Sequence, residues 1–500
     1  IRESVFQKVA DFGQKEMLEF SVPSLINRTT NDITQIQMFV AMGMQTMIKA
    51  PVMAVWAVIK IVNKSWTLSV ITAGFVVALL TLMLIVVLVI LPRVKRVQKL
   101  TDNINLISRE NLTGISVVHA YNAEEYQEDK FEKANDVLMR TQLFNQRAMA
   151  LLMPAVGLAM NALSLTIYWV GAAIVNRVPA ADLAGRISTF GDIVVFGTYA
   201  TYIVMSLMML VMILVLLPMA QVSAVRINEV LDAPISLHEG KTTEAPEQGT
   251  VEFRDVSFRY PSSSGDVLEH VSFRANKGET IAFIGATGSG KTTLVSLAAR
   301  FYDATEGQVL IDGQDVRSYS FDALYDRIGY VTQRAIVFAG DVRSNVLFGE
   351  SSAPQDDESV QRALSLAQAT EFVDKLPGKL DAPIAQAGAN VSGGQKQRLS
   401  IARALARKPE ILIFDDSFSA LDYRTDASLR AGLARELSDT TCLIVAQRIG
   451  TIRHADRIVV LDEGRVAGIG THDELMKNCG VYREIAMSQL SAAELEKEGV

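Results

Sequence analysis

Three long stretches of this sequence contain no charged residue. They cover residues 65–92, 148–176 and 193–225. Because the interior of a bilayer offers no water to backbone N–H and C=O groups, an apolar stretch of roughly 20 residues or more is expected to cross it as an α-helix. One such stretch would fit a buried helix of a soluble protein, but three of them favour membrane-spanning helices. The sequence therefore predicts an all-α polytopic membrane domain.

A fourth apolar segment, residues 33–61, is also predicted to span the membrane, although Lys49 and Lys60 interrupt it. The basic cluster at 93–99 sets the orientation, because positive residues beside a span favour the cytoplasmic side. The short segment 63–65 is then expected to form an outer turn. The predicted membrane domain covers residues 1–232, with spans near 33–61, 65–92, 148–176 and 193–218.

Residues 93–147, between the second and third spans, are polar and contain no proline. They are predicted to form two helices that continue into the cytoplasm, each about 35 Å long at a rise of about 1.5 Å per residue. The turn between them, at 121–126, would then lie far from the membrane and could press on a soluble domain. A solvated helical hairpin without such a role is the alternative.

The second half of the chain has the composition of a soluble α/β domain, expected over residues 251–490. Residues 233–250 are rich in Pro, Glu, Gly and Thr, which predicts a linker, and a tail is expected over 491–500. The chain has two cysteines, Cys442 and Cys479, so their spacing supports no disulfide framework or zinc site. The formal net charge of −7 averages two environments, and neither half carries a basic stripe suited to nucleic acid.

The most specific motif is GATGSGKT at residues 285–292, between an apolar run that ends at Ile284 and a helical pattern. This spacing, between a strand and a helix, places backbone N–H groups around phosphate oxygens at a helix N-terminus. Lys291 is expected to reach the β- and γ-phosphates, and Thr292 to bind Mg²⁺. A chance glycine-rich turn is the alternative, but every fixed position of the motif matches here, between a predicted strand and a predicted helix. The sequence therefore predicts a nucleoside triphosphate site. The residues assigned to it are Gly285, Ala286, Thr287, Gly288, Ser289, Gly290, Lys291, Thr292 and Thr293.

Three further residues are assigned to the same site. Residues 411–415 read as a buried strand that ends in a carboxylate, a pattern that places Asp415 near the magnesium ion. Tyr260, in FRYP, is a candidate to stack on adenine. Gln333, in IGYVTQ, is placed to reach the metal or the attacking water. The expected ligands are ATP and Mg²⁺.

Residues 391–403, VSGGQKQRLSIAR, carry a segment that other phosphate-loop ATPases lack. With the motifs above, this segment resembles the nucleotide-binding domain of ABC transporters, and the spanning helices resemble the membrane half of the exporter type. The resemblance covers essentially the whole chain. It implies a multi-pass half-transporter of a bacterial cell membrane with a cytoplasmic ATP-binding domain. Exporters of this family have six spans per half, so two upstream helices are expected to be missing from this sequence.

The resemblance also implies that two such domains pair head to tail. Each ATP then lies between the phosphate loop of one subunit and the signature segment of the other. The residues expected to act on the partner's ATP are Ser392, Gly393, Gly394 and Gln395. Ser419 and Asp422, in SALD, match the dimer-contact loop of the family.

Several residues depart from the family pattern. Asp416 replaces the glutamate that orients or deprotonates the attacking water, and it is one methylene shorter. Gln447 replaces a histidine that contacts the γ-phosphate, and glutamine cannot carry a positive charge. Gln386 also replaces a frequent glutamate. The catalytic site of this chain is therefore expected to be impaired, whereas the signature 392–395 is intact. This asymmetry and the tail 464–485 resemble bacterial heterodimeric multidrug exporters.

The leading hypothesis is an efflux subunit that moves apolar or amphipathic small molecules by alternating access. Its partner would be a second ABC half-transporter, in a heterodimer rather than a homodimer. A lipid or peptide exporter is the alternative within transport. An ATP-gated regulatory membrane protein without net pumping is the alternative from another class.

Overall fold

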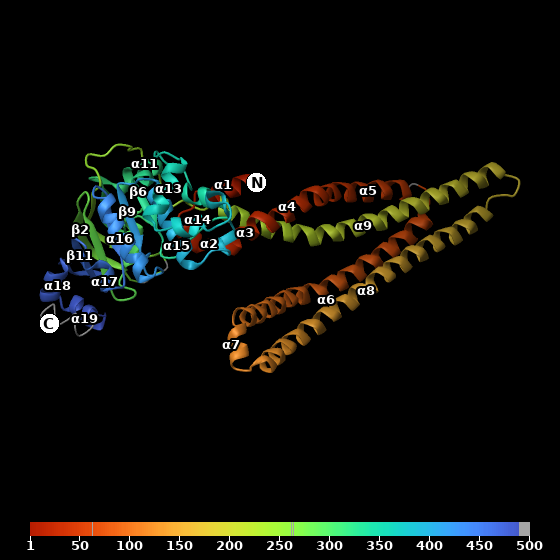
Figure 1. Ribbon diagram of the computed structural model, residues 1–500. Coiled ribbons are helices and arrows are strands. Elements are labelled where there is room, and N and C mark those ends of the chain that lie inside the picture. Colours follow the sequence, from red (N-terminus) through yellow and green to blue (C-terminus); the bar gives the residue numbers. More distant parts are fainter. Residues whose placement is uncertain (63, 262, 264, 490–500) are drawn as a thin grey trace. The chain divides into compact units, whose positions relative to one another are not determined.

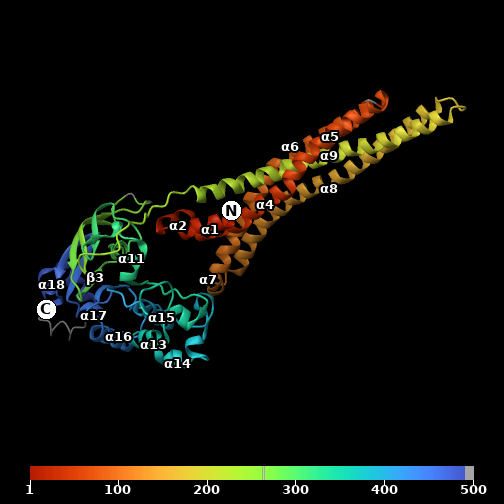
Figure 2. The same ribbon diagram turned by 90° about the horizontal axis from the view of Figure 1, so that it is seen from above.

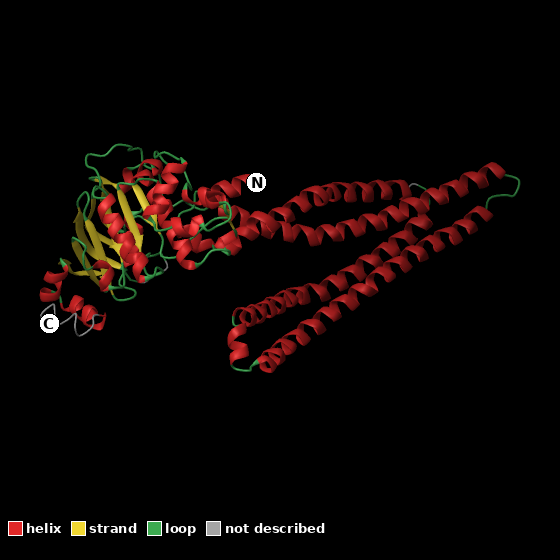
Figure 3. Cartoon of the chain, in the orientation of Figure 1, coloured by secondary structure: helices red, strands yellow, loops and turns green. Residues whose placement is uncertain are grey.

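The computed structural model describes residues 1–489 apart from residues 63, 262 and 264. The chain divides into two compact units, coloured by sequence in Figure 1. The first contains Ile1–Phe6 and Ile26–Asp232, and the second contains Gln7–Leu25 and the chain from Ala233 onward. The first unit is helical and the second is α/β (Figure 3), so the predicted fold class is confirmed. The tail expected over 491–500 lies outside the described residues.

The helices of the first unit are long. α6, α8 and α9 contain 48, 53 and 49 residues. At about 1.5 Å per residue each is roughly 70–80 Å long, well beyond the roughly 30 Å hydrocarbon core of a bilayer. The predicted hairpin between the second and third spans is confirmed, since α6 and α8 extend on either side of the short α7. The bounds are α4 (Ile33–Met38), α5 (Met44–Val62), α6 (Trp66–Thr113), α7 (Ile115–Ala120), α8 (Glu124–Asn176) and α9 (Leu183–Leu231), with π-helical turns at Arg28–Asp32 and Phe39–Gly43.

Within this unit α5 packs along α9, and α6 packs along α8 (Figures 1 and 2). Buried apolar side chains such as Ala57, Leu163 and Phe196 form the core between the helices. Other large apolar side chains point outward, and 56% of Trp56 and 77% of Trp169 are exposed. Such side chains suit a lipid environment. Among the described residues, four helical stretches are long and apolar enough to cross a membrane: Val22–Val62, Trp66–Ile90, Glu124–Asn176 and Leu183–Leu231.

The short helices at the start of the chain belong to both units. α1 (Arg2–Ala10) begins in the first unit and ends in the second, and α2 (Gln14–Phe20) lies in the second. The carboxylate of Glu16, in α2, accepts hydrogen bonds from the backbone N–H groups of Gly13 and Ser236, at 2.9 and 3.1 Å. The first bond caps α2, and the second joins α2 to the segment that follows α9. The third short helix is α3 (Val22–Asn27).

The second unit is built on a six-stranded sheet of order β12-β11-β3-β10-β9-β6, in which the edge strand β12 is antiparallel to β11 and the other neighbours are parallel. β9 and β10 are buried at every position, which explains their continuous apolar sequences. The carboxyl ends of the parallel strands meet at one edge, where open α/β sheets bind ligands. The strands of this sheet are β3 (Thr280–Gly285), β6 (Ile328–Val331), β9 (Ile411–Asp415), β10 (Thr441–Val445), β11 (Arg457–Asp462) and β12 (Arg465–Gly470).

A smaller antiparallel sheet of order β2-β1-β4-β5 and a two-stranded sheet, β7-β8, complete the strands of the described chain. The bounds are β1 (Val251–Phe258), β2 (Leu268–Ala275), β4 (Glu306–Ile311), β5 (Gln314–Asp315), β7 (Gly340–Asp341) and β8 (Pro383–Ile384). The α-helices that follow β3 in this unit are α10 (Lys291–Ala298), α11 (Phe321–Arg327), α12 (Val342–Val346), α13 (Asp357–Leu366), α14 (Thr370–Asp374), α15 (Gly393–Ala406), α16 (Tyr423–Glu436), α17 (Ile449–Ile452), α18 (His472–Asn478) and α19 (Gly480–Gln489).

The predicted linker, residues 233–250, is hydrogen-bonded along the second unit. The N–H of Gly240 donates to the carbonyl of Tyr319 at 2.8 Å, and the N–H of Thr242 donates to that of Ser318 at 2.9 Å. The guanidinium of Arg300 also donates to the carbonyl of His238 at 2.6 Å. These hydrogen bonds hold part of the segment along the surface of the second unit.

Candidate nucleotide site

The loop 285–290 joins β3 to α10, and the backbone of Gly290 explains its sequence. Gly290 has φ of +93°, and a Cβ there would lie 2.9 Å from the carbonyl oxygen of Val267. An L-residue would be strained in this conformation and would also clash. The glycine thus permits the turn that points the loop's backbone toward the helix N-terminus.

Lys291, the first residue of α10, is folded into this loop. Its Nζ donates to the carbonyls of Gly285 and Ala286, at 2.9 and 2.7 Å, and to Oγ of Ser289 at 3.2 Å. Burial lowers the pKa of Lys291, and the negative charges of Asp416 and Asp415 oppose that shift. The ammonium group lies beside a helix N-terminus that favours anions, which is the arrangement expected for phosphate.

Thr292 and Asp415 provide two oxygen donors suited to a hard cation. Oγ1 of Thr292 donates to Oδ1 of Asp415 at 2.9 Å, and the hydroxyl of Tyr330 donates to Oδ2 at 3.3 Å. Burial raises the pKa of Asp415, while the two hydroxyls oppose the rise. A threonine hydroxyl and a buried carboxylate fit Mg²⁺, which prefers few protein oxygens together with phosphate oxygens.

Asp416 follows β9 with a left-handed backbone, at φ of +47°. Its Oδ2 accepts hydrogen bonds from two amide groups, Nε2 of Gln447 at 2.7 Å and Nε2 of Gln333 at 3.2 Å. Burial raises the pKa of Asp416, whereas these two amides lower it. The three residues follow β9, β10 and β6, so the parallel sheet brings them together at the edge that carries the loop.

Tyr260 lies beside the first turn of α10. Its hydroxyl and Oγ1 of Thr293 are 3.0 Å apart, within hydrogen-bond distance. The ring packs edge-on against Phe258 and Tyr302, at centroid distances of 4.9 and 5.3 Å. The ring is therefore held in an aromatic cluster, and its stacking on adenine stays a prediction.

The signature residues begin α15. The N–H of Ser392 donates to Oε1 of Gln395 at 2.8 Å, and the N–H of Gln395 donates to Oγ of Ser392 at 3.4 Å, which forms a capping box. A Cβ added at Gly393 would meet no atom within 4 Å, and one at Gly394 would lie 3.6 Å from the carbonyl oxygen of Ala420. Nothing within the described chain therefore requires a glycine at position 393.

The two residues of the predicted dimer-contact loop have local partners in this chain. Oγ of Ser419 donates to the carbonyl of Asp416 at 2.8 Å. Asp422 caps α16, because Oδ1 accepts the N–H of Thr425 at 3.0 Å. The loop is thus tied directly to Asp416, the residue predicted to be catalytic.

Tyr330 is a site residue that the sequence reasoning did not select. Burial raises the pKa of its hydroxyl, and so does the charge of Asp415, so it remains a proton donor. The available signal was its place in IGYVTQ, three residues before Gln333 and on the strand next to β9. Strand pairing is a tertiary property, so the sequence did not reveal the contact.

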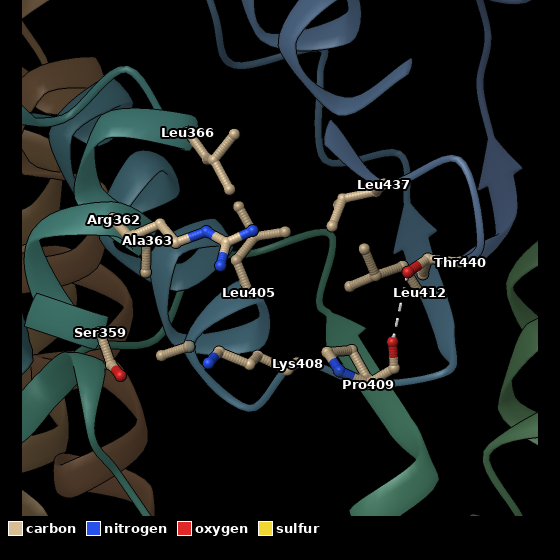
Figure 4. Close-up of a pocket in the computed structure, with 11 residues that line it drawn as sticks. Ser359, Arg362, Ala363, Leu366, Leu405, Lys408, Pro409, Leu412, Leu437 and Thr440 are labelled. Atoms are coloured by element: carbon tan, nitrogen blue, oxygen red, sulfur yellow. Dashed lines mark hydrogen bonds between the residues drawn. The ribbon is translucent and has the colours of Figure 1, made fainter. Parts of the chain in front are cut away.

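A cavity of about 160 Å³ lies elsewhere, at the start of β9 (Figure 4). Its lining includes the cationic side chains of Arg362 and Lys408 and apolar side chains such as Leu405 and Leu412. Because β9 runs from this cavity toward Asp415, the cavity is at the opposite end of the strand from the phosphate loop. We assign it no part of the nucleotide site.

Comparison with known proteins agrees with this arrangement. The family profile described as ABC transporter transmembrane region matches residues 1–225, and the one described as ABC transporter matches residues 268–419. An uncharacterized ABC transporter ATP-binding protein of Mycobacterium tuberculosis is 37% identical over 99% of this chain and 84% of its own length. An ATP-dependent lipid A-core flippase of Aromatoleum aromaticum is 31% identical over 100% of this chain and 81% of its own.

Solved structures extend the likeness to the fold. A bacterial Atm1-family ABC exporter with ATP bound matches with a TM-score of 0.77 and 26% identity, over 98% of this chain and 85% of that chain. The spanning helices and the bacterial relatives indicate a multi-pass plasma-membrane protein with a cytoplasmic ATP-binding domain. The chain therefore belongs to the ABC transporter family, as an exporter-type half-transporter that binds ATP.

Proposed function

We propose that this chain is the ATP-retaining subunit of a heterodimeric exporter that moves amphipathic compounds of the multidrug type out of the cell. Its own ATP site hydrolyses slowly, and its signature segment completes the site of a second half-transporter. The observation that carries the proposal is the environment of Asp416, where two glutamine amides donate to one carboxylate oxygen.

The geometry at Asp416 supports slow hydrolysis. An aspartate is one methylene shorter than glutamate, and a misplacement of about 1 Å can slow a reaction by roughly a hundredfold. Gln447 and Gln333 donate to the same Oδ2, which makes that oxygen a weaker base. Gln447 also brings no positive charge to the γ-phosphate. Nucleotide bound here is therefore expected to persist.

The structure of the signature segment, residues 392–395, supports a role in contacting the ATP that is bound by the second half-transporter. The capping box of Ser392 and Gln395 fixes the N-terminus of α15, a helix of 14 residues. A helix N-terminus favours a phosphate oxygen, and the side-chain-free Gly393 allows close approach. The free face of this segment is thus suited to the γ-phosphate of ATP held by another subunit.

Mg²⁺ has a donor set in this site. Thr292 and Asp415 would hold it, and Gln333 is the third candidate. When bound, the ion neutralises phosphate charge. The chain's own contribution is to place Lys291 and the loop amides around the phosphates and to keep Asp416 near the attacking water.

The decisive experiment is steady-state ATP hydrolysis by the full-length subunit in lipid, first alone and then with its partner half-transporter. We expect near-zero turnover alone, strong turnover in the pair, and loss of that turnover when Ser392 is changed to Ala. Rapid hydrolysis by this subunit alone would contradict the proposal and make Asp416 a working base in a homodimer.

A lipid exporter is the second candidate. The similarity to proteins named ATP-dependent lipid A-core flippase favours it, because one of them matches across this whole chain. A lipid-translocation assay in proteoliposomes, run beside an efflux assay with amphipathic dyes, separates the two substrate classes. ATP-dependent movement of lipid without dye efflux would select the lipid exporter.

A further inference from the structure

Gln489, the last residue of α19, holds the chain segment that follows β10. Its Oε1 accepts the N–H of Ile449 at 2.9 Å, and its Nε2 donates to the carbonyl of Gln447 at 2.8 Å. One side-chain amide therefore bonds the backbone on both sides of Arg448. The bonds join residues that are about 40 positions apart in the sequence.

The helix that carries Gln489 is firmly seated. Tyr482 and Ala486 of α19 are fully buried, and the hydroxyl of Tyr482 is 2.7 Å from Nδ1 of His472. α19 also packs against α17, which follows Gln447 (Figure 1), and against β3 and β11. The end of α19 is thus a fixed point from which a side chain can restrain a loop.

The loop that Gln489 restrains, residues 447–449, makes a direct contact with Asp416. Gln447 places its own amide on Oδ2 of Asp416 at 2.7 Å, while its backbone carbonyl is the group that Gln489 holds. Gln489 itself is exposed, and neither of its two bonds is made to its own helix. Its contacts therefore serve the loop rather than α19.

We propose that Gln489 is a positioning residue for the ATP site, which keeps Gln447 in hydrogen-bond reach of Asp416 through the backbone of residues 447–449. This inference rests on the proposed function, since it assigns a structural cause to the long retention of ATP. The C-terminal helix is then part of the machinery that sets the lifetime of bound nucleotide.

The test uses the assembled full-length transporter in lipid, loaded with labelled Mg-ATP and chased with unlabelled ATP. Gln489→Ala should speed the loss of labelled ATP from this subunit's site, through hydrolysis or release, by about three- to tenfold, the worth of one or two net hydrogen bonds. Ser488→Ala is the matched control, because among the described residues Oγ of Ser488 donates to the carbonyl of Ile485 in its own helix, at 2.7 Å, and to no group of the 447–449 segment. Its release rate should equal that of the unaltered protein.

A double-mutant cycle with Gln447→Ala separates positioning from general helix packing. If Gln489 acts through Gln447, the double variant releases ATP no faster than Gln447→Ala alone. Gln489→Glu keeps the acceptor for Ile449 and loses the donor to Gln447. It should retain amide-exchange protection at Ile449 while releasing ATP as fast as Gln489→Ala.

Two results would overturn the inference: additive effects of Gln447→Ala and Gln489→Ala, or unchanged release and unchanged exchange at Ile449 in Gln489→Ala. The proposed function is judged separately, by the absolute rate of the unaltered protein. Fast release or fast hydrolysis there would refute long retention, while the cycle and the amide exchange would still decide the role of Gln489.

Discussion

Oγ1 of Thr292 donates a hydrogen bond of 2.9 Å to Oδ1 of Asp415, which joins the first turn of α10 to the end of β9. The two residues are separated by 123 positions in the sequence. Their oxygens face each other because β3 and β9 flank the same central strand, β10. The loop before α10 and the carboxylate after β9 therefore form one site.

The first prediction concerns magnesium at this pair. Asp415→Asn replaces a charged oxygen donor, so the affinity of ATP in the presence of Mg²⁺ should fall by about 10- to 100-fold. Binding of labelled ATP, with Mg²⁺ and with EDTA, measures the effect. Thr292→Ser is the control, because it keeps the hydroxyl and should bind nearly as the unaltered protein does. Equal loss with and without Mg²⁺ would contradict the assignment.

The second prediction concerns the glutamate and histidine of the family pattern, which Asp416 and Gln447 replace in this chain. Asp416→Glu combined with Gln447→His should raise ATP hydrolysis by the subunit's own site by about ten- to a hundredfold. The side chain at position 416 becomes one methylene longer, and position 447 gains a titratable imidazole ring. The comparison is made in pairs whose partner site is silenced. Asp416→Asn with the same Gln447→His change is the control and should stay inactive. If the restored variant is no faster, another feature limits hydrolysis.

The third prediction tests the signature. A Cβ at Gly393 meets no atom within 4 Å, so Gly393→Ala should leave the unfolding temperature of the domain essentially unchanged. ATP hydrolysis by the assembled pair should nevertheless fall by at least about tenfold, because a methyl group obstructs the partner's γ-phosphate. Gly432→Ala is the matched control, since a Cβ there is equally unobstructed. Gly432→Ala should not reduce ATP hydrolysis by the pair as Gly393→Ala does, and it should not lower the unfolding temperature.

The fourth prediction concerns a buried acid beyond the end of β4. Burial raises the pKa of Asp312 to about 6, and the neighbouring Glu410 adds to the rise. The side chain is fully buried, and Oδ1 accepts the N–H of Thr250 at 2.9 Å. The folded state therefore binds this proton more tightly than the unfolded state does.

The resulting stabilisation is present below about pH 4 and is lost as the pH rises through about 6. Asp312→Asn should remove this dependence. The free energy of unfolding of the variant, minus that of the unaltered protein, should therefore increase by at most about 3 kcal/mol between pH 4 and pH 7. Unfolding of the full-length protein across this range measures it. Glu410→Gln should weaken the same dependence, and parallel pH profiles for all three proteins would refute the coupling.

Much of the architecture could be predicted because its signals are local. The uncharged stretches, such as residues 193–225, required spanning helices, and the proline-free segment 93–147 predicted the long hairpin of α6 and α8. The glycine spacing of residues 285–292 predicted the turn of the phosphate loop. Each of these signals lies within one element, where periodicity and backbone preference act.

The contacts around Asp416 followed from tertiary structure instead. Gln333, Asp416 and Gln447 were each selected from sequence, but only the order of β6, β9 and β10 in the sheet brings their side chains to one carboxylate oxygen. The same holds for the hydroxyl of Tyr330 on Asp415.

The sequence by itself determined the membrane spans, the phosphate loop and the family, because these depend on composition and on motifs within single segments. Only the tertiary structure decided that Gln489 holds the backbone of Gln447, and that Asp312 is buried against Glu410. Both contacts join residues far apart in the chain. Their energies depend on burial and on strand order, which no local pattern encodes.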